Sequence, residues 1–171
     1  MRTLCIFDFD DTLITSNAKV RVIKQTGRTK KLSTAQYAKY TPQPGDVFDF
    51  DEFDRYPKQL EIIEPVFAEL QASITLCGHD NVVILTARSN PLPVKMFLQQ
   101  HNIPDIEVKA VGSSDPMMKA YYILGRVKAE NFDQVVVFED NVKNIRTIRK
   151  VVSKTGTKLK TNRVKNGLVH S

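Results

Sequence analysis

Four short strand-like runs, three of them continuously apolar and one weaker, constrain the fold of this chain more than any other feature. They cover residues 3–9, 82–86, 106–111 and 134–138. Continuous apolar strands are typical of a parallel sheet that is covered on both faces. Between these runs, helical periodicity predicts helices over 57–76, 93–101, 116–129 and 141–152. The alternation predicts an α/β fold, a three-layer Rossmann-like doubly wound parallel sheet.

One segment, 15–56, interrupts this alternation. It holds a half-exposed alternating strand and then a run in which aromatic and acidic residues alternate. We expect a small inserted β-hairpin or flap within a single domain that spans 1–171. The aromatic residues Phe48, Phe50 and Phe53 fit either a packed hairpin face or a platform for stacking nucleic-acid bases. The polar, basic tail from Ser153 is expected to add an edge strand at 157–160 or to remain loose.

The charge of the chain is unevenly distributed. Its net charge is +6, yet no acid occurs between Thr12 and Gly45 or after Asp140, and nine basic residues lie between Lys143 and Lys165. Two basic stretches on a small domain favour an anionic partner such as nucleic acid, although a solvated basic surface would also explain them. With two cysteines and no long apolar segment, we expect a cytoplasmic protein with no membrane span.

Acidic and phosphate-binding side chains follow three of the predicted strands. These residues are Asp8, Asp10, Asp11 and Thr12, then Thr86 and Arg88, and finally Glu139 and Asp140. Ligands of an open parallel sheet bind beyond the carboxyl ends of its strands, so we expect these side chains to meet there, with Lys119 beside them. Clustered carboxylates need a cation, and hard oxygen ligands suit Mg²⁺. A carboxylate can also accept a phosphoryl group, so the set predicts metal-assisted phosphoryl transfer through an aspartyl-phosphate.

The chain resembles the haloacid dehalogenase superfamily of phosphohydrolases. Its first motif matches Asp8-Phe-Asp10-Asp-Thr12, and its second matches Thr86 after an apolar strand. The third motif is a lysine about 20 residues before an acidic pair; Lys119 fits it better than Lys128. The pair itself is Glu139-Asp140. All four motifs occur in family order across residues 8–140.

The resemblance implies a role for each matching residue. Asp8 would be the nucleophile and Asp10 the general acid and base, with Thr12 orienting their loop. Thr86 and Lys119 would hold the phosphoryl oxygens, and we include Arg88 and Asp11 among the candidate phosphate contacts. Arg88 could equally form a salt bridge. The metal ligands would be Asp8, Asp10 (through its backbone carbonyl) and Asp140, and the role of Glu139 stays open as direct ligand, water-mediated ligand or loop support.

We therefore expect a Mg²⁺-dependent phosphohydrolase that acts on a nucleic-acid end or a nucleotide phosphate monoester. A small flap leaves the site open to an extended substrate, and the basic flap and basic tail could bind DNA or RNA ends, as in the phosphatase domains of polynucleotide kinase-phosphatases. Two alternatives remain. One is a phosphatase of a small phosphorylated metabolite or a phosphoprotein, and the other is a nucleic-acid-binding module without catalysis.

Overall fold

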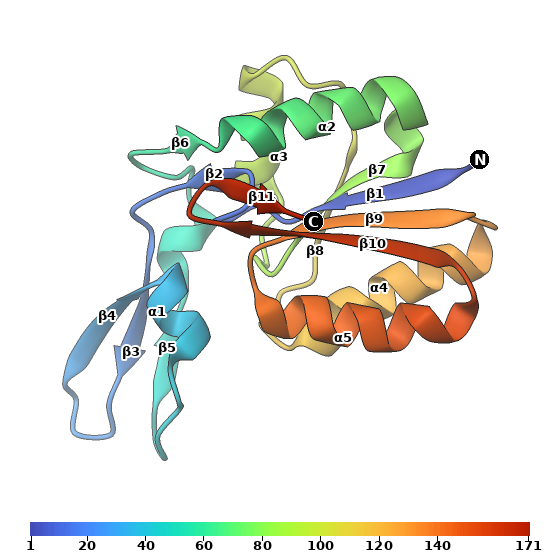
Figure 1. Cartoon of the computed structure of the whole chain (residues 1–171). Helices are drawn as coiled ribbons and strands as arrows, with labels where there is room; N and C mark the ends of the chain where they lie inside the picture. Colours follow the sequence, from blue (N-terminus) through green and yellow to red (C-terminus); the bar gives the residue numbers. More distant parts are fainter.

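The computed structural model describes all residues, 1–171, and centres on a six-stranded sheet in the order β11-β10-β9-β1-β7-β8 (Figure 1). All neighbouring strands are parallel except β11, which is antiparallel to β10. The strands are β1 (Thr3–Phe7), β7 (Val82–Thr86), β8 (Glu107–Ala110), β9 (Gln134–Glu139), β10 (Lys158–Lys165) and β11 (Leu168–His170). The prediction of a mainly parallel α/β sheet is confirmed.

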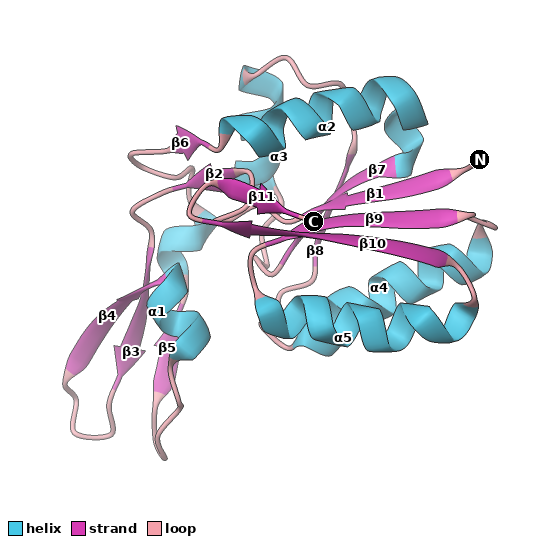
Figure 2. Ribbon diagram, in the orientation of Figure 1, coloured by secondary structure: helices cyan, strands magenta, loops and turns pink.

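Helices cover both faces of this sheet, as Figure 2 shows. One face carries α2 (Glu64–Cys77) and α3 (Leu92–Gln100), and the other carries α4 (Pro116–Ala129) and α5 (Val142–Val152). Successive residues of β1 therefore serve different cores: Phe7 packs in the cluster with α2 and α3, and Ile6 packs in the cluster with α4 and α5. Burial on both sides explains why the strands are apolar without alternation. No helix combines the length and the hydropathy that a bilayer span requires.

The helix predicted over 57–76 begins seven residues later, at Glu64, so its predicted start was wrong. The preceding residues instead form β6 (Glu61–Ile62), which pairs with β2 (Ile14–Thr15). The amide of Ile63 also donates to the carbonyl oxygen of Leu13 at 2.8 Å. These hydrogen bonds hold the segment extended beside the loop that follows β1, so tertiary pairing overrides the local apolar spacing.

The tail is more ordered than the sequence suggested. β10 has eight residues rather than the four expected, and β11 returns along it. The two strands are joined at Asn166 and Gly167, whose φ angles of 52° and 73° fit a tight hairpin turn. This Asn-Gly pair is the signal that the sequence analysis did not use. The register places Arg163 of β10 directly beside Glu139 of β9.

The inserted segment forms a small three-stranded sheet in the order β4-β3-β5, visible at the lower left of Figure 1. It consists of β3 (Lys19–Ile23), β4 (Thr29–Ser33), α1 (Thr34–Lys39), β5 (Val47–Asp49) and the short 3-10 helix η1 (Asp51–Asp54). Two further 3-10 turns, η2 (His79–Asn81) and η3 (Ser153–Thr155), lie outside it. We call the segment the flap; the β2–β6 pair forms its stem.

The aromatic residues of the flap pack on one another. Tyr37 meets Phe48 and Phe50 edge to face, each with ring centroids 5.5 Å apart, and Phe53 is buried. Phe48 packs against the small core of the flap, which Ala18, Val20 and Phe53 form, whereas Phe50 stays exposed beside it.

Candidate active site

The predicted site residues converge at the carboxyl ends of three adjacent strands, β9, β1 and β7. Asp8 directly follows β1, and its amide donates to the carbonyl oxygen of Phe138 at 3.0 Å. Glu139 is the last residue of β9, and Thr86 is the last of β7. Because β1 pairs with both neighbours, Asp8 lies between the residues from β7 and β9.

Asp8 is buried and held by two donors. Lys119 Nζ lies 2.7 Å from its Oδ1, and the hydroxyl of Thr12 donates to its Oδ2 at 2.9 Å. Thr12 Oγ1 is also 3.3 Å from Asp140 Oδ1. Thr12 is placed by a tight turn in which the amide of Leu13 donates to the carbonyl oxygen of Phe9. The carboxylate is thus fixed in one orientation before any substrate binds.

Lys119 joins Asp8 to Glu139, because Nζ also donates to Glu139 Oε2 at 2.8 Å. The same oxygen accepts a hydrogen bond from Asn144 Nδ2 at 3.1 Å, and Oε1 accepts from the amide of Asn141 at 3.0 Å. Glu139 therefore anchors the lysine and the start of α5, in addition to standing near Asp8 and Asp140.

The sequence left two questions open: whether Lys119 or Lys128 is the lysine of the site, and what Glu139 does. Lys119 is in the first turns of α4 and almost fully buried, whereas Lys128 is exposed in the last turn. The role of Glu139 was left open, and the structure shows that Asn144 of α5 donates a hydrogen bond to it. Neither the contact nor its direction could be inferred from spacing.

The cluster holds three carboxyl groups and one basic group. One ligand oxygen each of Asp8, Glu139 and Asp140 lie within 4.8 Å of one another, with Lys119 as their buried cation. Burial, together with the charges of Asp8 and Glu139, raises the pKa of Asp140 to about 11. Burial and the charge of Glu139 also raise the pKa of Asp8. Burial opposes ionisation of Glu139 too, but Lys119 outweighs it and lowers the pKa of that carboxyl.

The donor set of the cluster fits a divalent cation. Three carboxyl groups converge beside a single buried lysine, and carboxylate oxygens are the ligands that Mg²⁺ prefers. The side chain of Asp10 is not part of this set; Glu139 stands there with Asp8 and Asp140. A role for Asp10 in metal binding would thus have to come from its backbone, as the resemblance implied.

The free energy of unfolding should depend on the ionisation of Asp140 in this candidate cation site. Asp140 has a folded pKa of about 11 against an ordinary value of 3.8, so its ionised form destabilises the fold. In EDTA, the free energy of unfolding should fall as pH rises above about 4, because the carboxyl then ionises more readily in the unfolded chain. Asp140→Asn should flatten this dependence and raise the unfolding midpoint at pH 8.

The effect of Mg²⁺ on the free energy of unfolding tests whether Asp140 is a ligand. At 100 times its dissociation constant it should stabilise the wild type by about 2.7 kcal/mol, and it should not stabilise Asp140→Asn. Both quantities come from urea titrations in EDTA and in MgCl₂. Equal Mg²⁺ stabilisation of both proteins would show that Asp140 is not a ligand.

Asp10 and Arg88 form an ion pair beside the cluster. Arg88 Nε and Nη2 donate to the two carboxylate oxygens of Asp10 at 2.8 and 2.7 Å. Arg88 Nη1 donates to the carbonyl oxygen of Phe53 in the flap at 2.8 Å, and its guanidinium lies over the rings of Phe9 and Phe53. Of the two roles left open for Arg88, the structure displays the salt bridge.

Asp11 also faces the flap. Its carboxylate accepts a hydrogen bond from the hydroxyl of Thr34, the first residue of α1, and its φ angle is 61°. Burial raises the pKa of Asp11. The side chain expected among the phosphate contacts thus joins the loop after β1 to the flap, a contact that no sequence signal indicated.

Three further polar contacts dock the flap beside the site. The hydroxyls of Tyr37 and Ser114 are 3.1 Å apart, Asn90 Nδ2 is 3.4 Å from the carbonyl oxygen of Asp54, and Lys143 Nζ is 3.5 Å from that of Ala38. The flap therefore contacts loops that follow β1, β7, β8 and β9, and forms one wall of the site.

Thr86 is fully buried at the end of β7. Its hydroxyl oxygen accepts a hydrogen bond from the amide of Arg88 at 3.2 Å, which leaves its own proton to donate to a bound anion.

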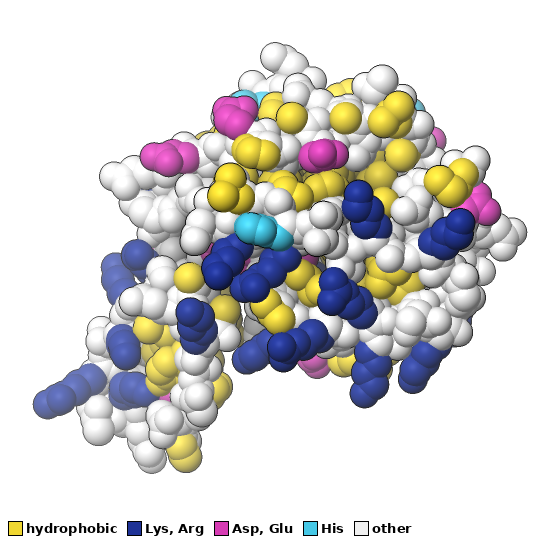
Figure 3. All heavy atoms as spheres, viewed as in Figure 1, with side chains coloured by type: hydrophobic (Ala, Val, Ile, Leu, Met, Phe, Trp, Pro, Cys, Tyr) yellow, Lys and Arg dark blue, Asp and Glu magenta, His cyan; other side chains and the backbone are white.

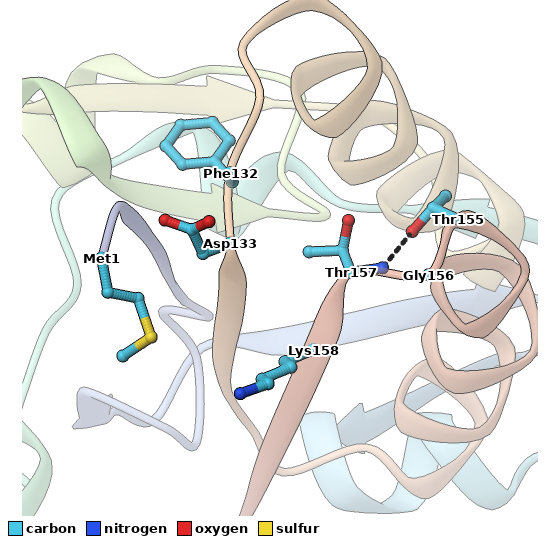
Figure 4. Close-up of a pocket in the computed structure, with 7 residues that line it drawn as sticks. All are labelled: Met1, Phe132, Asp133, Thr155, Gly156, Thr157 and Lys158. Carbon is cyan, nitrogen blue, oxygen red and sulfur yellow. Dashed lines mark hydrogen bonds between the residues drawn. The ribbon is translucent and has the colours of Figure 1, made fainter.

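A depression of about 630 Å³ lies at the opposite end of the sheet, where β1, β9 and β10 begin (Figure 4). Its labelled residues include Met1, Asp133 and Lys158, and none of the predicted catalytic residues lines it. The candidate chemistry is therefore confined to the other end of the strands.

Comparisons with protein-family models, with curated proteins and with solved structures found no match.

Proposed function

We propose that this protein is a Mg²⁺-dependent phosphohydrolase of phosphate monoesters, with a Rossmann-like doubly wound sheet and the catalytic plan of the haloacid dehalogenase superfamily. One observation carries the proposal: Asp8 is held by Lys119 and Thr12 and lies against Glu139 and Asp140, at the ends of adjacent strands. A buried, oriented carboxylate beside an excess of acids suits nucleophilic attack on phosphorus better than it suits structural support.

The first step transfers the phosphoryl group to Asp8. A carboxylate oxygen of Asp8 attacks phosphorus, the bond between phosphorus and the ester oxygen breaks, and the leaving oxygen takes a proton from Asp10. In this step, Lys119 and Thr86 would donate hydrogen bonds to the phosphoryl oxygens. Each Asp10 oxygen accepts one hydrogen bond from Arg88 and keeps a lone pair for the proton that this step requires.

The second step releases phosphate. Asp10, now a carboxylate, takes a proton from a water molecule, whose oxygen attacks phosphorus as the bond to Asp8 breaks. Inorganic phosphate leaves, and Asp8 and Asp10 return to their starting states. One residue acts as acid and then as base, as microscopic reversibility requires.

Asp8 and Asp140 would hold the cation, with Glu139 beside them. When bound, Mg²⁺ offsets the negative charge that would otherwise repel a phosphate from a carboxylate nucleophile. Lys119 contributes fixed positive charge at the same point, and its burial makes that charge effective.

The test is phosphate release with MgCl₂ or EDTA. The substrates are a chromogenic aryl phosphate, sugar phosphates, mononucleotides and oligonucleotides phosphorylated at the 3′ or 5′ end. We expect Mg²⁺-dependent release from at least one substrate and none from Asp8→Asn. Release that EDTA does not reduce, or that persists in Asp8→Asn, would contradict the proposed mechanism.

A further inference from the structure

Part of the positive charge of the flap is neutralised by acidic residues of the flap itself. Arg21 pairs with Asp49, Lys24 with Asp46 and Lys31 with Glu52. These pairs join the basic first half of the flap to its acidic second half. The basic stretch that the sequence placed near the site is therefore a weaker attraction for an anion than its composition implied.

The C-terminal part of the chain has no such compensation. No acidic side chain follows Asp140, and no Lys or Arg beyond it lies within 4.0 Å of a carboxylate. In Figure 3, Lys and Arg side chains gather over the region of α5, β10 and β11, whereas acidic side chains lie mainly near α2. The excess charge of the protein is concentrated on this side.

Five exposed basic residues lie on the adjoining elements α5 and β10, and we call this strip the C-terminal basic surface. They are Lys143, Arg146, Arg149, Arg163 and Lys165. The first three follow one another at a spacing of three residues along α5, whose opposite side is buried. Arg149 Nε donates to Thr161 Oγ1 at 2.9 Å, which shows that this side of α5 meets the face of β10 that carries Thr161. Arg163 and Lys165 alternate with Thr161 and so share that face.

This surface begins at the candidate active site. Arg163 is in register with Glu139 on the neighbouring strand, and Lys143 follows Asp140 by three residues at the start of α5. Lys143 also contacts the flap through the carbonyl oxygen of Ala38. The strip therefore leads from the acid cluster outward along α5.

We infer that the C-terminal basic surface binds the phosphodiester backbone of a single-stranded polynucleotide whose terminal phosphate monoester is the substrate at Asp8. The inference rests on the proposed function and names its substrate class. A repeating polyanion matches a strip of unpaired cations, since each contact releases counterions. The acid cluster itself is negative, so the affinity for a polyanion must come from beside it.

The strip also sets the length of strand that it can hold. From Lys143 to Arg149, α5 extends about 9 Å at 1.5 Å per residue. At 3.4 Å per nucleotide, this length corresponds to about three nucleotides. We expect kcat/KM for end-phosphorylated oligonucleotides to increase with length up to about three nucleotides and then to level off.

The decisive variant is the triple substitution Arg146→Gln, Arg163→Gln and Lys165→Gln, which leaves the catalytic residues intact. Its matched control is Lys95→Gln, Lys109→Gln and Lys128→Gln, three exposed lysines on α3, β8 and α4 with no carboxylate partner. The test variant should lose tenfold or more of kcat/KM on a phosphorylated ten-nucleotide strand, mainly through KM. Its salt dependence should become shallower by about 2 in log–log slope, for three lost contacts at about 0.7 each. Turnover of the aryl phosphate should not change.

The outcomes separate this inference from the proposed function. If the test variant keeps the kcat/KM of the wild type on oligonucleotides, or if the control loses as much, the C-terminal basic surface does not bind the polynucleotide. Neither result would contradict the proposed phosphohydrolase function. If no substrate is hydrolysed, the proposed function fails, and fluorescence anisotropy with the same strand still tests the surface. The inference is supported if the test variant, but not the control, binds this strand more weakly than the wild type does and with a smaller dependence on salt. Loss of binding only to vesicles of anionic phospholipid would assign the surface to a lipid headgroup and overturn the inference.

Discussion

Asp8→Asn should abolish turnover by a factor of about 10⁴ or more while the protein stays folded. The amide has nearly the shape of the carboxylate and still accepts a hydrogen bond from Thr12, but it cannot take up the phosphoryl group. Because the pKa of Asp8 is raised, its ionised form destabilises the fold at neutral pH, and a neutral amide should not lower stability in EDTA.

Two readouts check this expectation. Acid quenching with a ³²P-labelled monoester should trap a hydroxylamine-sensitive phosphoprotein in the wild type and none in Asp8→Asn. Thermal unfolding in EDTA should show a midpoint equal to or above that of the wild type. Asp105→Asn, at an exposed aspartate, provides the matched control. A labelled Asp8→Asn protein would place the nucleophile elsewhere.

Lys119→Met should reduce both stability and activity. Removing the cation leaves Asp8 and Glu139 buried without their common partner, and breaking a buried ion pair in this way costs about 3–5 kcal/mol. A lost donor at the phosphoryl oxygens should lower kcat by about 10²-fold or more. Urea unfolding in EDTA and phosphate release in MgCl₂ measure the two effects.

A double variant separates the loss of stability in Lys119→Met from its loss of activity. Glu139→Gln removes one of the two stranded charges, so Lys119→Met with Glu139→Gln should regain part of the stability and none of the activity. Lys128→Met, on the same helix but exposed, should change the free energy of unfolding by about 0.5 kcal/mol or less. If Lys119→Met unfolds at the urea concentration of the wild type, the ion pairs contribute nothing to stability.

The central sheet could be predicted because its strands are buried on both sides. The run at 82–86 and the helix at 116–129 match β7 and α4 residue for residue, since continuous apolar composition and Pro116 mark their limits. The start of α2 could not be predicted, because Ile63 is held by the distant Leu13 rather than by its neighbours. β10 was underestimated for a related reason: its residues are polar and depend on pairing with β9.

The members of the candidate site were predictable from strand ends, but their partners were not. Asp8, Thr86 and Glu139 meet because parallel strands end at a common edge. The docking of the flap depends on Thr34, Tyr37 and the carbonyl oxygen of Phe53, which have no periodicity or motif. The neutralisation of the flap by its own acids also depends on strand pairing, so composition alone overstated its charge.

The central position of β1 has a consequence for how the chain is made. Of the strands in the central sheet, β1 is synthesised first, and its two neighbours β7 and β9 come from far later in the sequence. At 5–20 residues per second, the chain between Phe7 and Val82 takes roughly 4 to 15 s to make, and during that time β1 has neither of its neighbours. The growing chain must therefore keep β1 from pairing wrongly until its neighbours are synthesised, and the complete site forms only after Asp140 has been added.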